Sequence, residues 1–167
     1  TGWSGSLTMG AGQFCTNPGI AVVIEGSDAD AFAETAKAAL AQVGAQVMLT
    51  DGIAEAYRAG RDRVAAATGV QGLLTSVCDL RNATPYLFEV SGNDWLANHA
   101  LGEEVFGPLG LIVRARDFAQ MQEIAASLEG QLTCTLHLDA GDSAEASALL
   151  PVLERKAGRI LANGFPT

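Results

Sequence analysis

The stretch GIAVVIEGSDAD, residues 19–30, indicates a β-strand followed directly by an α-helix. Ile20–Ile24 is a short, mostly β-branched run with glycines close to both ends, a pattern typical of a strand buried in a sheet. Ser27 stands where a helix N-cap belongs, and Asp28 and Asp30 fall in the first turn, where carboxylates interact favourably with the helix dipole. We therefore expect a strand at residues 20–24 and a helix capped by Ser27.

Strand and helix patterns alternate along the rest of the chain. Apolar runs and period-two alternation predict further strands at residues 73–78, 85–90, 109–115, 131–139 and 159–162, with a turn at 91–94. Helical spacing predicts further helices after Asp51, at Asp117 with Gln120 as its capping partner, and from Ser143, with a break at Pro151. This alternation favours an α/β fold, a mostly parallel sheet with helices on both faces.

The composition is that of a globular protein and excludes several partners. The 167 residues suit one domain, and the hydrophobic fraction of 49% against 17% charged residues is typical of a packed core. The 19 acidic side chains outnumber the 10 basic ones, and the basic ones form no cluster that would neutralise nucleic-acid phosphates. No apolar stretch approaches the ~20 residues that span a bilayer. We expect neither nucleic acid nor a membrane as a partner.

The three cysteines, at positions 15, 78 and 134, form an odd and widely spaced set. This is not a disulfide framework, and no Cys-x-x-Cys pair indicates a zinc or other metal site. Free thiols of this kind are typical of a reducing compartment, so we expect the cytoplasm. Cys78 and Cys134 lie in or beside apolar runs and are most simply core thiols.

Cys15 differs from the other two because it lies in the stretch GAGQFCTNPG, residues 10–19. Its neighbours are glycines and polar residues, and glycines let backbone approach a ligand closely. A cysteine in such a turn is a candidate nucleophile, with backbone N–H groups nearby to hold an oxyanion. The alternative is an inert thiol that packs, which is the commoner fate of a cysteine.

Two motifs resemble those of one enzyme superfamily. The run Gly-Gln-Phe-Cys at residues 12–15 resembles the Gly-Gln-x-Cys motif around the nucleophile of aldehyde dehydrogenases, and Glu104-Val105-Phe106-Gly107-Pro108 resembles their Glu-x-Phe-Gly-Pro cofactor motif. The longer run QFCTNPG and the closing NGFPT, residues 163–167, are similar to the branch that acts on 2,5-dioxopentanoate (α-ketoglutarate semialdehyde) and on fatty aldehydes. Thr8 departs from the aromatic or aliphatic residue that many members carry there.

The resemblance implies a chemistry and a set of roles. Cys15 would attack an aldehyde to form a thiohemiacetal, and hydride transfer to NAD or NADP would leave a thioester that water hydrolyses to the carboxylic acid. Glu104 would accept hydrogen bonds from the nicotinamide ribose, with Phe106 as an aromatic contact beside it. Phe14, Thr16 and Phe165 would line the aldehyde pocket. The full-length protein would be a homo-oligomer.

The resemblance also implies that residues 1–167 are a partial catalytic domain, with nucleotide-binding and oligomerisation segments absent. The oxyanion asparagine and the glutamate that activates water are expected outside this chain, so the fragment alone should be inactive. We expect folding to bring the Cys15 thiol and the Glu104 carboxylate to the rim of one cleft.

Two other functions remain open from the residues alone. One is a non-catalytic α/β interaction domain in which Cys15 is buried and structural. The other is a cysteine hydrolase, which needs a histidine within hydrogen-bonding distance of Cys15, and His99 is the candidate. His137 falls on the polar face of the strand expected at residues 131–139 and is interpreted as structural.

Overall fold

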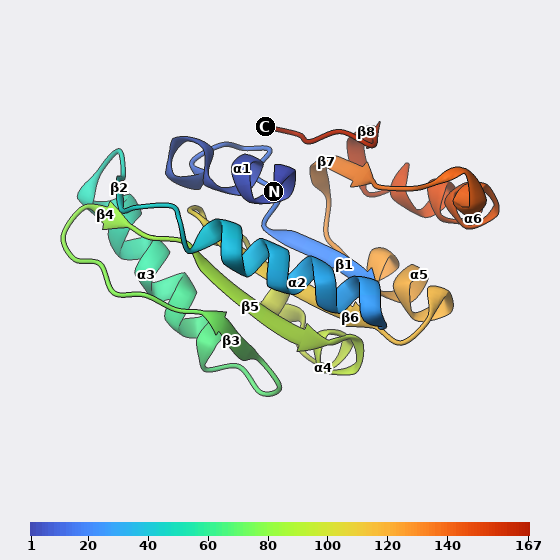
Figure 1. Cartoon of the computed structure of the whole chain (residues 1–167), viewed down its shortest axis with the longest axis horizontal. Coiled ribbons are helices and arrows are strands. Elements are labelled where there is room, and N and C mark those ends of the chain that lie inside the picture. Colours follow the sequence, from blue (N-terminus) through green and yellow to red (C-terminus); the bar gives the residue numbers. More distant parts are fainter.

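The computed structural model describes residues 1–167 as an α/β fold around one four-stranded sheet (Figure 1). In spatial order the strands are β1 (Ile20–Ile24), β6 (Leu109–Ala115), β5 (Tyr86–Ser91) and β3 (Gln71–Leu74). The first three strands are mutually parallel, and β3 pairs antiparallel with β5 at one edge. The expected α/β class with a mostly parallel sheet is confirmed.

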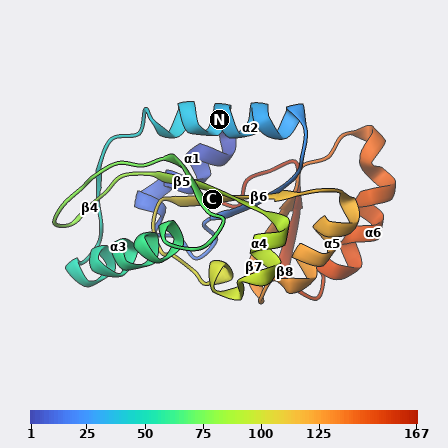
Figure 2. The same cartoon turned by 90° about the horizontal axis from the view of Figure 1, so that it is seen from below.

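Helices cover both faces of this sheet, as the edge-on view shows (Figure 2). One face carries α1 (Gly2–Thr8) and α2 (Ser27–Leu40), and the other carries α3 (Asp51–Ala65), α4 (Gly92–Ala97) and α5 (Phe118–Ser127). The central strand β6 supplies side chains to both layers, because Ile112 packs with α1 and α2 while Leu111 and Val113 belong to the opposite cluster. Burial on both faces explains its continuous apolar sequence.

Two small sheets flank the main one. The strands β2 (Gln46–Val47) and β4 (Asn82–Ala83) pair antiparallel, and β7 (Gln131–Leu136) pairs parallel with β8 (Ala157–Ala162). The last helix, α6 (Ser143–Leu153), packs on α5 through a small cluster of Ala125, Leu149 and Leu153. Three short 3₁₀ helices complete the chain: η1 (Met9–Gly12), η2 (His99–Gly102) and η3 (Ala140–Asp142). None of the helices is both long and apolar enough to cross a membrane.

Several elements follow the sequence patterns closely. The strands expected at residues 20–24 and 109–115 have those bounds, and the strand expected at 85–90 is shifted by one residue. Asp117 caps α5 as predicted, because its carboxylate accepts a hydrogen bond from the Gln120 amide at 2.8 Å. The capping pair is not reciprocal, since the Gln120 side chain accepts instead from the Arg116 amide.

Other local predictions are wrong. The strand expected at 73–78 covers residues 71–74, and the turn expected at 91–94 is the start of α4. Ser91 is the N-cap of that helix and accepts from the Asp94 amide at 3.1 Å, so a capping pattern was interpreted as a turn. Ser27 does not cap α2, because Gly26 occupies the cap position and no side chain accepts there.

The C-terminal predictions also need correction. Pro151 lies inside α6 without a break; the carbonyl that loses its helical partner belongs to Ser147, an exposed residue where water is available. The strand expected at 131–139 ends at Leu136, so His137 lies beyond it. Leu132 is 58% exposed, because only Cys134 and Leu136 on that face reach the cluster beneath α6.

A charged network ties two strands to a helix. Arg114 on β6 donates from Nε to Glu89 on β5 and from a terminal nitrogen to Asp30 on α2 at 2.7 Å. The side chains of Arg114 and Glu89 are only 15% and 20% exposed. Glu89 therefore depends on the arginine for its counter-charge.

Replacement of this arginine is predicted to destabilise the protein. Arg114→Met leaves the Glu89 carboxylate half-buried without a partner, and the free energy of unfolding should fall by about 1–3 kcal/mol. Lys37→Met is the control, since the Lys37–Glu34 pair is exposed on both sides and should change stability by less than about 0.5 kcal/mol. Urea unfolding of both variants checks this, and equal losses would contradict it.

Candidate active site

Cys15 lies at the surface in a tight turn that follows η1. Gly10, Ala11 and Gly12 all have left-handed backbone, with φ of 56°, 58° and 68°, and the Asn17 amide closes the turn on the Phe14 carbonyl at 3.0 Å. Ala11 is 2% exposed, and this conformation costs an alanine roughly 1–2 kcal/mol. Such strain persists only where the surroundings impose it, and it is concentrated at functional sites.

The backbone around Cys15 is anchored on three sides. The Asn17 side chain donates to the Leu7 carbonyl, and the Trp3 indole donates to the Pro18 carbonyl, both at 2.8 Å. The Gln13 side chain accepts from the Leu49 amide, also at 2.8 Å. Cys15 itself is exposed and makes no hydrogen bond. The turn thus presents a free thiol on a fixed backbone.

The end of the chain lies against the same turn. The Thr167 hydroxyl donates to the Thr16 carbonyl at 3.2 Å, and the Thr167 amide donates to the Ser6 hydroxyl at 3.2 Å. The Phe165 ring covers Gly2, where an added Cβ would lie 3.0 Å from its Cδ2 atom. Phe165 is also 5.0 Å from the His137 ring, centroid to centroid.

The three predicted pocket residues differ in exposure and in contacts. Thr16 is half-buried and its hydroxyl faces the Pro166 carbonyl and the Thr167 hydroxyl, both at 3.4 Å. Phe14 is 42% exposed and covers Gly10, and Phe165 is 43% exposed. The two aromatic rings have apolar surface to offer a ligand, whereas Thr16 is engaged with the chain itself.

Glu104 and Phe106 lie in the loop between η2 and β6. The loop is fixed to α3, because Glu103 forms an ion pair with Arg63 at 3.0 Å and Val105 packs against Gly60. Glu104 is exposed and takes part in no ion pair or hydrogen bond, and Phe106 is half-buried. A carboxylate of this kind is free to accept hydrogen bonds from a ligand.

The two loops meet because they precede neighbouring parallel strands. The Cys15 turn leads into β1 and the Glu104 loop leads into β6. Both therefore lie at the N-terminal ends of these parallel strands. There the backbones touch: a Cβ on Gly12 would lie 2.5 Å from the Gly107 oxygen and from the Pro108 nitrogen. Sequence reasoning identified both motifs but missed this glycine contact, for which glycine itself was the available signal.

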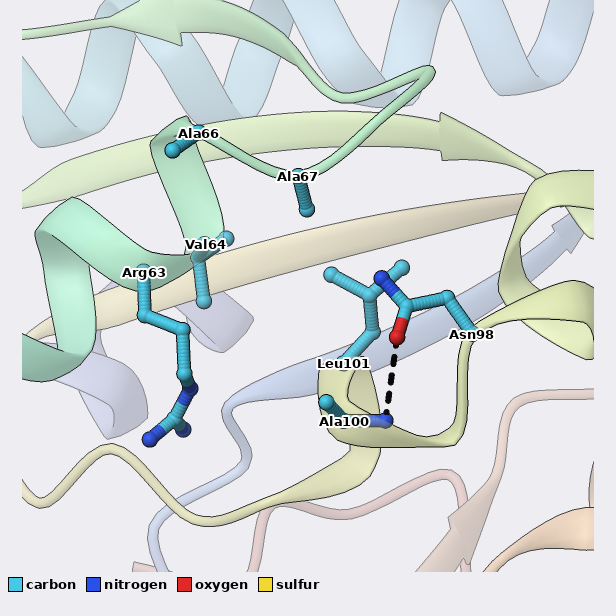
Figure 3. A pocket seen from close by; sticks show the side chains of 7 residues that line it. All are labelled: Arg63, Val64, Ala66, Ala67, Asn98, Ala100 and Leu101. Carbon is cyan, nitrogen blue, oxygen red and sulfur yellow. Dashed lines mark hydrogen bonds between the residues drawn. The ribbon is translucent and has the colours of Figure 1, made fainter.

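Two cavities of the structure lie away from these two loops. One of about 250 Å³ lies between the end of α3 and η2, lined by Arg63, Val64, Ala66, Ala67, Asn98, Ala100 and Leu101 (Figure 3). Another of about 370 Å³ has Arg61, Cys78 and Tyr86 in its wall. Neither is lined by Cys15 or Glu104, so a cleft between them stays a prediction.

The other expectations for cysteine and histidine are resolved in part. Cys15 is exposed, so residues 1–167 alone do not bury it as the interaction-domain alternative expects. No hydrogen bond joins Cys15 to a histidine, and His99 is an exposed residue of η2. Burial raises the pKa of the Cys134 thiol, as expected for a core cysteine. No group of three or more His, Cys, Asp or Glu side chains could hold a metal ion.

Comparison with known proteins identifies the family. Over 172 aligned residues, covering 100% of this chain, it is 50% identical to alpha-ketoglutaric semialdehyde dehydrogenase 2 of Azospirillum brasilense. It is 35% identical over 165 residues, 97% of the chain, to alpha-ketoglutaric semialdehyde dehydrogenase of Acinetobacter baylyi. The chain belongs to the aldehyde dehydrogenase superfamily. It spans about a third of the length of these relatives, 32% and 31% respectively. No family model matches the sequence.

Solved aldehyde dehydrogenases share the fold. Aldehyde dehydrogenase 21 from Physcomitrella patens, in complex with the reaction product succinate, matches 99% of this chain with a TM-score of 0.79 at 18% identity. Glyceraldehyde-3-phosphate dehydrogenase GapN from Methanocaldococcus jannaschii, complexed with NADP, matches 99% with a TM-score of 0.78 at 22% identity. The chain covers 34% and 36% of those proteins. The resemblance expected from the two motifs is confirmed.

The contact between the two loops leads to a stability prediction. Gly12→Ala places a methyl group against the Gly107–Pro108 backbone and strains a left-handed residue, so the free energy of unfolding should fall by about 2–4 kcal/mol. Gly5→Ala in the neighbouring helix α1 is the control, because no atom lies within 4 Å of its added Cβ. It should be neutral or stabilise by up to about 1 kcal/mol. Urea unfolding compares them, and a harmless Gly12→Ala would show that the loops do not touch.

Proposed function

We propose that residues 1–167 are the partial catalytic domain of an NAD(P)-dependent aldehyde dehydrogenase, with Cys15 as the nucleophile. The observation that carries the proposal is the exposed thiol on an anchored turn, whose backbone touches the loop that holds Glu104. A thiol that served the packing of these residues would be covered by them. In the proposed enzyme, the Cys15 motif and the Glu104 motif must lie close together, because one acts on the aldehyde and the other on the cofactor that oxidises it. The backbone contact between the two motifs supports this arrangement.

Each reacting atom has a place in the proposed reaction. The Cys15 thiolate adds to the aldehyde carbon and gives a thiohemiacetal, while the Cys15 backbone N–H holds the carbonyl oxygen. NAD or NADP, held through Glu104 and Phe106, would supply the hydride acceptor for that carbon, and Cys15 would then carry a thioester. Water then cleaves the thioester, releasing the carboxylic acid and restoring the thiol. We propose that the oxyanion asparagine and the base that activates this water are supplied by segments outside residues 1–167.

The residues of the Glu104 loop fit a bound dinucleotide. The Glu104 carboxylate is exposed and unpaired, so its oxygens are available to ribose hydroxyl donors. Phe106 is half-buried beside it and offers an aromatic surface to the nicotinamide ribose. We propose these two residues as cofactor contacts. We propose Phe14, Thr16 and Phe165 as the lining of the aldehyde pocket, where Thr16 also holds the turn in place through its contacts with Pro166 and Thr167.

The proposed substrate is α-ketoglutarate semialdehyde. The similar proteins of Azospirillum and Acinetobacter are both named for that aldehyde, at 50% and 35% identity over nearly the whole chain. We further propose that the full-length protein is a homo-oligomer and that it is cytoplasmic; the three free cysteines support the second of these proposals. The isolated chain should not turn over, because part of the catalytic set lies outside it.

Removal of the proposed nucleophile should abolish turnover. In the full-length protein, Cys15→Ser is expected to lower kcat for NAD(P)H production from α-ketoglutarate semialdehyde by at least ~10³-fold, because a serine hydroxyl is scarcely ionised at neutral pH. Cys78→Ser is the matched control and should keep kcat within about twofold. Turnover by Cys15→Ser close to wild type would sink the proposal.

Glu104→Gln should weaken cofactor binding without affecting the Cys15 nucleophile. The amide accepts ribose hydroxyls less well than a carboxylate, so KM for NAD or NADP is expected to rise about tenfold. Alkylation of Cys15 by iodoacetamide, in the absence of cofactor, should stay unchanged. Glu123→Gln is the control, since that carboxylate is exposed on α5 and lies outside the Glu104 loop. Equal KM changes in the two variants would count against a role for Glu104 in the site.

A further inference from the structure

Helix α3 contacts the loop that contains Glu104 at regularly spaced positions. Along the helix, Tyr57, Gly60 and Arg63 follow one another at intervals of three residues and lie on one face. They contact Gly107, Val105 and Glu103 of the loop in turn. Every second loop residue thus faces the helix. In an extended chain, residues between them face the opposite way, and those residues are Glu104 and Phe106.

Tyr57 is the member of this series that reaches furthest into the site. A Cβ on Gly107 would lie 2.7 Å from Cε2 and 2.9 Å from Cγ of the Tyr57 ring, so the ring packs directly against that glycine. On its other side Gly107 touches Gly12 of the Cys15 turn. Gly107 has φ +155° and is enclosed between the aromatic ring and the Gly12 backbone.

Burial of the ring holds Tyr57 in this position, with a smaller contribution from its hydroxyl. The hydroxyl donates to the Thr84 carbonyl at 2.8 Å and lies 3.4 Å from the Pro108 carbonyl, which itself accepts from the Tyr86 amide at 3.0 Å. The side chain is 1% exposed. Burial, aided by the nearby Cys78 thiol, holds the pKa of Tyr57 above its ordinary value of 10.0. The phenol is therefore a hydrogen-bond donor throughout the neutral range.

We infer that Tyr57 is a positioning residue, which holds the Glu103–Gly107 loop against the Cys15 turn and so sets where Glu104 stands relative to the thiol. The inference rests on the proposed function for the meaning of Glu104, but the contact chain from Tyr57 through Gly107 to Gly12 does not. An aromatic ring suits this task because a flexible side chain would allow the loop to shift. A displacement of about 1 Å at a reacting group can cost roughly 100-fold in rate.

The test compares three variants of the full-length protein. Tyr57→Leu removes the ring from Gly107, Tyr57→Phe keeps the ring and removes only the hydroxyl, and Ile124→Ala opens a cavity in α5 within the same core cluster. Hydrogen exchange of the Leu109 and Tyr86 amides, which donate to the Gly107 and Pro108 carbonyls, is measured first, without cofactor. Tyr57→Leu should accelerate their exchange at least ~10-fold, whereas Tyr57→Phe should stay within about threefold of wild type.

Cofactor binding is the second measurement, by titration with NAD and NADP. Tyr57→Leu should raise Kd for the preferred cofactor at least ~10-fold, and Tyr57→Phe and Ile124→Ala should change it less than about threefold. Unchanged exchange of the Leu109 and Tyr86 amides in Tyr57→Leu, or equal changes in Tyr57→Leu and Ile124→Ala, would overturn the inference. If the wild-type protein binds neither cofactor, the proposed function fails, and the exchange data still decide the role of Tyr57.

Discussion

The backbone contact between Gly12 and Gly107 is the constraint on which the rest of the site depends. It joins two segments that are almost a hundred residues apart in sequence, and neither glycine has room for a Cβ. Because the contact is between backbones, no rotamer change can loosen it. The left-handed turn that presents Cys15 and the loop that presents Glu104 are therefore held at one spacing.

The parallel sheet explains how this contact forms. β1 and β6 are neighbouring parallel strands, and the segments that precede them must lie side by side at the same edge. The Leu111 amide donates to the Gly19 carbonyl at 2.8 Å, which fixes the register immediately beyond the two loops. Because β6 is packed on both faces, its N-terminal end, where the chemistry is proposed, is held in a fixed position.

The proposed site combines rigid backbone with exposed reacting groups. Hydrogen bonds from Asn17 and Trp3 and the acceptor on Gln13 hold the turn, and α3 holds the opposite loop. The Cys15 thiol and the Glu104 carboxylate remain uncommitted to any partner within the chain. A side chain that is free of other partners and is attached to a fixed backbone can contact a substrate or cofactor without prior rearrangement.

The sequence by itself determined the local elements and the two motifs. Local patterns predicted the strands at residues 20–24 and 109–115 and the cap at Asp117. The short motifs around Cys15 and Glu104 likewise indicated the protein family. Each of these predictions depends on residues only a few positions apart. Where a local pattern had two interpretations, as at Ser91 or Pro151, the choice depended on packing and on exposure, which the pattern does not contain.

Only the tertiary structure decided which distant residues meet. The antiparallel edge strand β3, the packing of residues 165–167 on the Cys15 turn and the place of Tyr57 behind Gly107 have no periodic signature in the sequence. The physical reason is that periodicity reports which face of an element is buried but not which partner buries it. That partner is chosen by the closing of the whole core, and the site is defined there.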